Sequence, residues 1–237
     1  MCLPLFAGCA TTPRTTTDTT DSIDPYEPVN RKVYSFNDGM DRYFLKPVAT
    51  VYADITPDMM QTGVTNFFNN ITYINVILNS SLQGKIDQGF SDLFRFVFNS
   101  TLGIAGLFDV ATPMGIPAHN EDLGQTYATW GLGQGPYLTL PFFGPNTVRD
   151  APDLVTSWLL DPIRYLAATI SLPATALEII NLRANLLDAT NALDQAALDP
   201  YSFTRESYLQ RRNFLIHDGA PPASAEEEDI FSQPLEN

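Results

Sequence analysis

Apolar residues recur every three or four positions along several segments of the chain, which is the spacing of one face of an α-helix. The first segment opens at Asp24, which stands at an N-cap position, with Pro25 at the first helical position. Later prolines separate the segments, because proline disfavours helical backbone at and before its own position. In the first half of the chain this pattern predicts helices over residues 25–45, 48–55, 57–70 and 84–98.

Residues 121–150 interrupt the helical pattern with glycine, proline and aromatic residues, so we expect loops and bends there. Helical spacing resumes over 153–168, where Asp161-Pro162 is an expected break, and over 173–199. Pro200 then starts a final helix that ends near Gly219. The sequence therefore predicts a mainly α fold, in which residues 24–219 form a single domain of short amphipathic helices with Gly/Pro-rich loops.

The predicted helices expose more apolar surface than a water-soluble core requires. Only 17% of residues are charged, against about a quarter in ordinary soluble domains. The apolar face of residues 84–98 is wide, and the nearly uncharged run at 99–110 contains Gly103 and Gly106. These segments could lie at a lipid boundary, or they could form a buried helix pair in a soluble core. The longest uncharged stretches are interrupted by Gly, Pro, Asn and Gln, so we expect no ordinary transmembrane helix.

The charge of the chain excludes one class of partner. The 27 acidic and 13 basic residues give a net charge of −14, which repels a phosphate backbone, so we expect no nucleic-acid binding. Four acidic residues lie together at 226–229. We expect residues 220–237 to form an acidic, disordered tail.

The first residues resemble the end of a bacterial lipoprotein signal peptide. Ala7 and Gly8 precede Cys9, as small residues precede the lipid-modified cysteine of a lipobox. This predicts a signal-peptide remnant at 1–8, lipidation of Cys9 by a diacylglyceryl group and a further acyl chain such as palmitate, and a flexible Thr-rich tether at 9–23. The alternative is an unremarkable apolar N-terminus. A disulfide framework is not expected, because Cys2 lies in the remnant.

Catalytic signals are weak throughout the chain. His119 and His217 have no second histidine or cysteine at metal-ligand spacing. The polar cluster at 119–122 could support acid/base chemistry but is interpreted more simply as a solvated loop. The glycines at 131, 133 and 135 lack the lysine and the βαβ context of a phosphate-binding loop. We therefore assign no catalytic, cofactor-binding or metal-binding residue and expect no cofactor.

Several motifs resemble the VacJ/MlaA family of outer-membrane lipoproteins, along most of the chain. The first are Asp-Pro-Tyr-Glu-Pro-Val-Asn-Arg at 24–31 and Tyr-Ser-Phe-Asn at 34–37. A longer one starts Phe-Arg-Phe-Val-Phe-Asn-Ser-Thr at 94 and continues to residue 109. The remaining matches lie at 121–126, 131–144, 149–150, 199–201 and 208–212.

The resemblance implies a non-enzymatic lipoprotein of the Gram-negative outer membrane, anchored to its periplasmic leaflet. Its fold would be a helical ring within that leaflet, with a central polar passage for phospholipid headgroups and an apolar rim. Family members remove phospholipids misplaced in the outer leaflet and pass them to a periplasmic carrier, MlaC, for retrograde transport, which maintains lipid asymmetry. They commonly bind trimeric porins. A lipoprotein phospholipase and a structural lipoprotein that braces porins are the alternatives.

The resemblance also suggests residues along the lipid passage. Residues 34–37 match a family segment in the first helix near the gate of the passage, and the alternative role of this segment is helix packing. Glycines would permit close helix approach or bends near the passage. The candidates are Tyr34, Phe36, Asn37, Gly103, Gly106, Gly131, Gly133 and Gly135.

Overall fold

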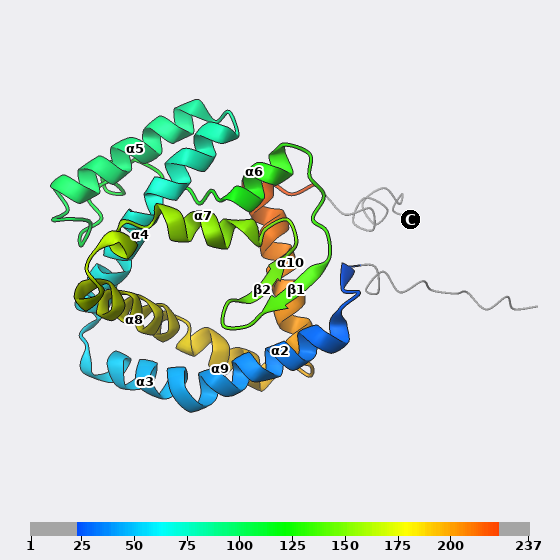
Figure 1. The fold of residues 1–237 in the computed structure, drawn as a ribbon. Helices are drawn as coiled ribbons and strands as arrows, with labels where there is room; N and C mark the ends of the chain where they lie inside the picture. Colours follow the sequence, from blue (N-terminus) through cyan, green and yellow to red (C-terminus); the bar gives the residue numbers. More distant parts are fainter. Residues whose placement is uncertain (1–22, 223–237) are drawn as a thin grey trace, which may run out of the picture.

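The helices of the chain are arranged as a ring around a central opening (Figure 1). This computed structural model describes residues 23–222. The expected lipidation site at Cys9, the tether up to residue 22 and most of the acidic tail lie outside the described residues. The mainly helical fold and the ring arrangement confirm the expected fold class.

The first arc of the ring is one continuous curved rod. Helix α2 (Glu27–Met40) continues through a π-helix, η1 (Asp41–Leu45), into α3 (Lys46–Ile55). The expected separation into two helices, over 25–45 and 48–55, with a break at Lys46-Pro47 between them, is therefore wrong. Proline has no backbone N–H to donate, and the wider π turn immediately before Pro47 lets the chain continue where a regular α-turn would kink.

Helix α4 (Asp58–Leu82) crosses from this arc to the far side of the ring and pairs with α5 (Ile86–Thr101). The expected end of α4 near residue 70 is wrong by about three turns. Asn70, Asn75 and Asn79 have low helix propensity, but all three are buried and bond to other side chains. Tertiary hydrogen bonds therefore outweigh local propensity in this helix.

The Gly/Pro-rich segment contains more regular structure than expected. It holds α6 (Leu123–Thr129) and an antiparallel hairpin of β1 (Tyr137–Leu140) and β2 (Gly144–Thr147), whose ends pair Tyr137 with Thr147 and Leu140 with Gly144. At the hairpin tip, Phe142 has a φ of 67° and Gly144 a φ of 77°. The glycine permits the tight turn that directs the tip toward the centre of the ring (Figure 1).

The second half of the ring is helical. Helix α7 (Pro152–Leu160) ends at Asp161-Pro162 as expected, and a 3-10 turn, η2 (Pro162–Tyr165), follows. The single helix expected over 173–199 is instead two: α8 (Ala168–Asn185), which contains Pro173, and α9 (Leu187–Ala196). The chain turns a corner at Leu186, between these two helices. The apolar spacing continues through Leu186, so the periodicity alone does not reveal this corner. The last helix, α10 (Pro200–Ile216), ends before Gly219 as expected.

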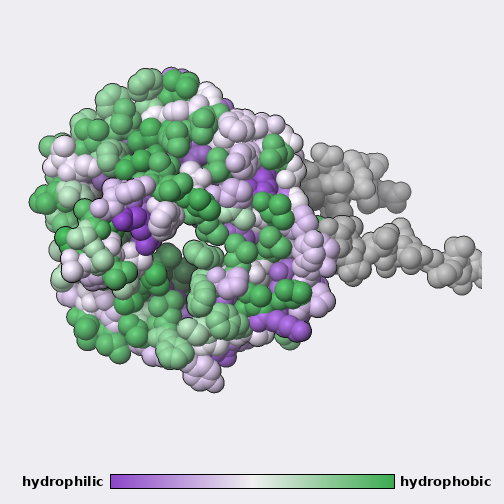
Figure 2. Space-filling model, viewed as in Figure 1, coloured by the Kyte–Doolittle hydropathy of each residue, from purple (hydrophilic) through white to green (hydrophobic). Residues whose placement is uncertain are grey.

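Polar side chains, not apolar ones, fill the interior of the walls. Among residues 23–222, twenty-one buried residues are polar or charged and nine are apolar. Large apolar side chains are exposed on almost every helix, and Figure 2 shows them over much of the visible face. No helix in the described range is long and apolar enough to cross a membrane. The usual distribution of polar and apolar residues is therefore reversed.

Ion pairs between distant segments connect the ring. We call five of them the polar frame, and each joins an arginine to one or two aspartates. Most of these pairs link two different elements. Four of the five arginine side chains are 10% exposed or less. The polar frame consists of Arg31–Asp199, Arg95–Asp109, Arg183–Asp41, Arg205–Asp24 and Arg212–Asp122/Asp150.

The polar frame closes the ring by joining its first and last helices. Asp24, which is almost fully buried, accepts hydrogen bonds from Arg205 and Tyr201 of α10 and from Asn30 of α2. Arg31 of α2 donates to both carboxylate oxygens of Asp199, the N-cap of α10. The two ends of the domain, far apart in sequence, therefore lie side by side (Figure 1).

Arg212 binds two aspartates from different parts of the chain. Its guanidinium donates to both oxygens of Asp122, the N-cap of α6, and to Asp150, which follows β2. Burial by itself would raise the pKa of Asp122, but hydrogen bonds from Arg212 and its charge outweigh burial and lower that pKa. Both carboxylates therefore stay ionised, and α10, α6 and the hairpin are tied at one point.

We predict that Arg212→Ala destabilises the domain by about 3–5 kcal/mol, because Asp122 loses its arginine partner and Asp150 keeps only Arg149. Denaturant unfolding of the purified protein in detergent measures the free energy. Arg211→Ala is the matched control, since Arg211 is the exposed neighbour on the same helix. Equal loss of stability in both variants would contradict the assigned role of Arg212.

Candidate functional site

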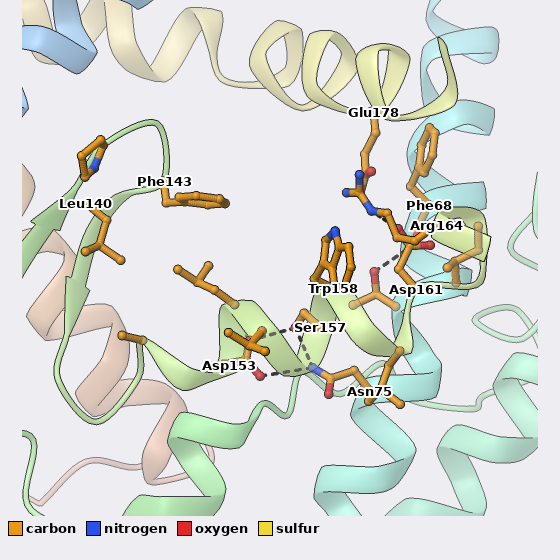
Figure 3. Close-up of a pocket in the computed structure, with 17 residues that line it drawn as sticks. Phe68, Asn75, Leu140, Phe143, Asp153, Ser157, Trp158, Asp161, Arg164 and Glu178 are labelled. Carbon is orange, nitrogen blue, oxygen red and sulfur yellow. Dashed lines mark hydrogen bonds and ion pairs between the residues drawn. The ribbon is translucent and has the colours of Figure 1, made fainter. Parts of the chain in front are cut away.

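A cavity of about 700 Å³ lies within the ring. Figure 3 shows 17 residues around it, contributed by α4, the β1–β2 hairpin, α7, η2 and α8. Figure 2 shows the molecule hollowed at this place. Elements from both halves of the chain must therefore come together to form the cavity.

Apolar side chains form most of the cavity wall. Phe68 comes from α4, Leu140 and Phe143 from the hairpin, and Leu154 and Trp158 from α7. Phe143 is 68% exposed and Trp158 is 55% exposed, so more than half of each side chain is free of contact with the protein. These surfaces are available to an apolar ligand.

A polar strip runs along one side of the same cavity, where α4 meets α7. The Asn75 amide donates to the Ser157 hydroxyl over 3.1 Å and to Asp153 over 3.4 Å, and Ser157 donates to Asp153 over 2.9 Å (Figure 3). Asp153 also accepts the backbone N–H of Leu123. The Asp153 carboxylate is thus fully engaged within the protein and is a structural part of the wall.

Three charged side chains form a corner of the cavity, which we call the charged corner: Asp161, Arg164 and Glu178. The Arg164 Nε lies 3.0 Å from an Asp161 oxygen, and the Arg164 Nη1 donates to Thr175 over 3.0 Å. Burial raises the pKa of Glu178, the charge of Asp161 raises it further, and the charge of Arg164 opposes both. Figure 3 shows Trp158 beside this corner, opposite Phe143.

A second cavity of about 530 Å³ lies on the other side of the hairpin tip. It is mostly apolar and is lined by α2, η1, α3, the hairpin and α8, with Phe44, Val48 and Phe142 among its residues. Phe143 lines both cavities. The hairpin tip therefore separates two apolar spaces of comparable size.

The candidates on α2 contact the hairpin and the last helix. The Asn37 amide donates to the Leu140 carbonyl over 2.9 Å, and its oxygen accepts the Phe142 N–H over 2.9 Å. Phe36 packs edge-on against Phe142, with ring centroids 5.4 Å apart. Tyr34 packs in the same manner against Tyr201 of α10. Asn37 and Phe36 thus hold the hairpin tip beside the cavity.

The glycine candidates lie farther from the cavity. A side chain at Gly103 would collide with the Phe108 carbonyl, and one at Gly106, which has a φ of 89°, would collide with Asn70. Both glycines therefore permit the tight loop after α5. Gly131, Gly133 and Gly135 lie between α6 and β1. None of the eight candidates lines the main cavity, although Asn37 lines the second one, so their role along a lipid path stays a prediction.

Sequence analysis did not identify the residues that form the cavity itself. Trp158, Arg164 and Glu178 come from three elements whose arrangement depends on tertiary contacts. Glu178 lines the cavity and makes no hydrogen bond to another described residue. Its position between Leu177 and Ile179 was the one signal that could have singled it out.

The polar cluster at 119–122 is packed into the fold, so the expectation of a solvated loop is wrong. Glu121 is almost fully buried and accepts hydrogen bonds from Gln83, Lys85 and Gln88. His119 contacts Asp92 over 2.7 Å, and the Ser80 hydroxyl donates to that same Asp92. Within the described range no three His, Cys, Asp or Glu residues are grouped to hold a metal ion.

The exterior, the walls and the cavity of the ring all have the polarity expected of a protein in contact with lipid. Exposed apolar side chains face outward on most helices, the polar frame lies inside the walls, and the cavity combines an apolar wall with a charged corner. Extensive exposed apolar surface of this kind marks a site of contact with a partner or a membrane. Together these features define a ring-shaped helical protein that lies against lipid.

The chain belongs to the MlaA lipoprotein family, whose model matches residues 22–215. The intermembrane phospholipid transport system lipoprotein MlaA of Escherichia coli strain K12 is 35% identical over 236 residues, covering 95% of this chain and 92% of that protein. A protein of Rickettsia bellii is 38% identical over 191 residues, covering 80% of this chain and 75% of its own length. These relatives confirm the family that the motifs suggested.

A solved structure from work on the structural basis for maintenance of bacterial outer membrane lipid asymmetry has the same fold. It superposes with a TM-score of 0.71 at 34% sequence identity, and the match covers 81% of this chain and 98% of that chain. The ring is therefore a shared architecture of the two proteins.

We predict that Asn37→Ala loosens the hairpin tip. The Phe142 N–H loses its acceptor, so its hydrogen exchange should accelerate about fivefold, the scale of one net hydrogen bond. Hydrogen exchange with mass spectrometry of the peptide that contains Phe142 measures this. Ser35→Ala is the control, because the Ser35 hydroxyl bonds only to a carbonyl of its own helix. Unchanged exchange in Asn37→Ala would show that other contacts hold the tip.

Proposed function

We propose that this chain is an outer-membrane lipoprotein that removes mislocalised phospholipids from the outer leaflet and passes them to a periplasmic carrier. The cavity within the ring is the single observation that carries the proposal. Its apolar wall suits acyl chains and its charged corner suits a headgroup. In this way the protein would contribute to retrograde transport and maintain the lipid asymmetry of the outer membrane.

The position in the membrane follows from the distribution of apolar residues. The exposed apolar side chains on α3, α5 and α7 would contact acyl chains, while the ring is formed without a membrane-spanning helix in the described range. A ring of this kind fits within one leaflet, and we assign it to the periplasmic one. Acyl chains on Cys9 would add stable attachment, since each buried methylene contributes about 0.8 kcal/mol.

The proposal includes two partners. Relatives are named as lipoproteins of an intermembrane phospholipid transport system, and transport between membranes requires a component that crosses the aqueous periplasm. We assign that step to a periplasmic carrier such as MlaC. We also assign part of the exposed apolar surface to contact with trimeric porins.

A non-enzymatic function is the simpler interpretation of the polar groups. The nearest arrangement to a catalytic triad is Ser80, Asp92 and His119, but the serine donates to the aspartate and not to the histidine. A nucleophile needs its base within hydrogen-bond reach. These residues also lie outside the lining of the main cavity. We therefore expect no phospholipid hydrolysis by the purified protein.

We predict that deleting the gene increases the phospholipid exposed in the outer leaflet. The wild-type chain should reverse this, and Cys9→Ala should not, because it removes the anchor. Labelling of outer-leaflet lipid on intact cells measures the exposure. Unchanged asymmetry after deletion would contradict lipid transport and favour a structural role in bracing porins.

We also predict that filling the cavity blocks transport without unfolding the ring. Val155 is exposed into the cavity from α7, so Val155→Trp should occupy space that a lipid needs. Val51→Trp is the matched control, since Val51 is similarly exposed on α3 but lines none of the cavities described here. Both variants should accumulate and melt like wild type. Full complementation by Val155→Trp would show that lipids do not pass through this cavity.

A further inference from the structure

Arg164 differs from the arginines of the polar frame in how its donors are used. Arg31, Arg183 and Arg212 each donate two hydrogen bonds to one carboxylate. Arg164 approaches Asp161 through Nε over 3.0 Å, but that contact lacks hydrogen-bond alignment. Its aligned bond goes to the neutral Thr175 hydroxyl. The Nε is buried, whereas Nη2 donates to no described residue and is not buried, so Arg164 retains donor capacity at the cavity surface, where its side chain is 30% exposed.

The charged residues that line the cavity give it a net negative charge. Arg164 is the single basic residue among the lining residues, against Asp153, Asp161 and Glu178. Asp153 is engaged by Asn75, Ser157 and a backbone N–H. Glu178 is the opposite case, because it accepts no hydrogen bond from any described residue. One donor-rich cation and one unpartnered carboxylate thus face the same space (Figure 3).

An aromatic ring completes the chemistry of the charged corner. Trp158 lies beside Arg164 and Glu178 in Figure 3, and more than half of its surface is exposed. Indole is the preferred ring for contact with an organic ammonium ion, and a carboxylate adds a counter-charge. The guanidinium of Arg164 suits phosphate oxygens, to which it can donate in a fork.

We propose that the charged corner recognises the headgroup of a zwitterionic phospholipid, with Arg164 binding the phosphate and Glu178 and Trp158 binding the ammonium group. This assignment rests on the proposed transport function and names the substrate class for that cavity. A zwitterionic headgroup supplies both charges that the corner lacks. An anionic headgroup supplies only the phosphate and meets a net-negative lining without compensation. Phosphatidylethanolamine should therefore bind better than phosphatidylglycerol.

Native mass spectrometry of the full-length protein in detergent, with equal amounts of dioleoyl phosphatidylethanolamine and dioleoyl phosphatidylglycerol, tests the assignment. We expect the wild type to retain the ethanolamine lipid in about fivefold excess, the scale of one partly exposed ion pair. Glu178→Gln should abolish that preference and leave the total bound lipid similar. Arg164→Gln should lower binding of both lipids, because both carry the phosphate. Free phosphoethanolamine at the same concentration should compete weakly, since it lacks contact with the apolar wall.

Asp188→Asn is the matched control, because Asp188 is exposed on the next helix and lines none of the cavities described here. Thermal unfolding checks that each variant remains folded. Equal binding of the two lipids by the wild type, or an unchanged preference in Glu178→Gln, would overturn the headgroup assignment while leaving transport intact. Binding of neither lipid would contradict the lipid-filled cavity and with it the proposed function.

Discussion

The structure depends on pairing arginines, most of them buried, with aspartates. Asp24 with Arg205, and Asp199 with Arg31, join the first helix to the last and close the ring. A helix surrounded by lipid gains little from burying apolar side chains against another helix, because the acyl chains are equally apolar. Hydrogen bonds and ion pairs therefore hold these helices together where a water-soluble protein would use an apolar core.

This reversed distribution explains why a narrow ring with a hollow centre is stable. A soluble domain with so few buried apolar residues would not offset the loss of chain entropy on folding. In this protein the apolar side chains face outward, toward lipid. Hydrogen bonds and ion pairs, which are directional, determine how the helices pack inside the wall. A buried charge without its partner is costly, so the correct pairing also selects against alternative arrangements of the helices.

In the cavity, too, some polar groups hold the protein together and others are free to contact a ligand. Asp153 makes its hydrogen bonds within the wall, where it holds α7 against α4 and the start of α6. The Arg164 Nη2 and the Glu178 carboxylate, in contrast, bond to no described residue and keep hydrogen-bonding capacity at the surface of the cavity. The hairpin tip, held by Asn37, brings Phe143 opposite them and adds the apolar wall. An amphipathic ligand can therefore contact both kinds of surface at once.

The sequence by itself determined the mainly helical fold, the positions of most helices, the excess of apolar surface and the family, because these depend on local spacing and on contiguous motifs. The predictions from sequence were wrong at three positions. At Pro47 a π turn keeps the helix continuous, at Asn70 side-chain hydrogen bonds to other elements extend the helix, and at Leu186 a corner interrupts an unbroken apolar pattern. The site was determined only by tertiary structure. Trp158, Arg164 and Glu178 belong to three separate elements, and ring closure by ion pairs between the two ends of the domain makes them face one cavity.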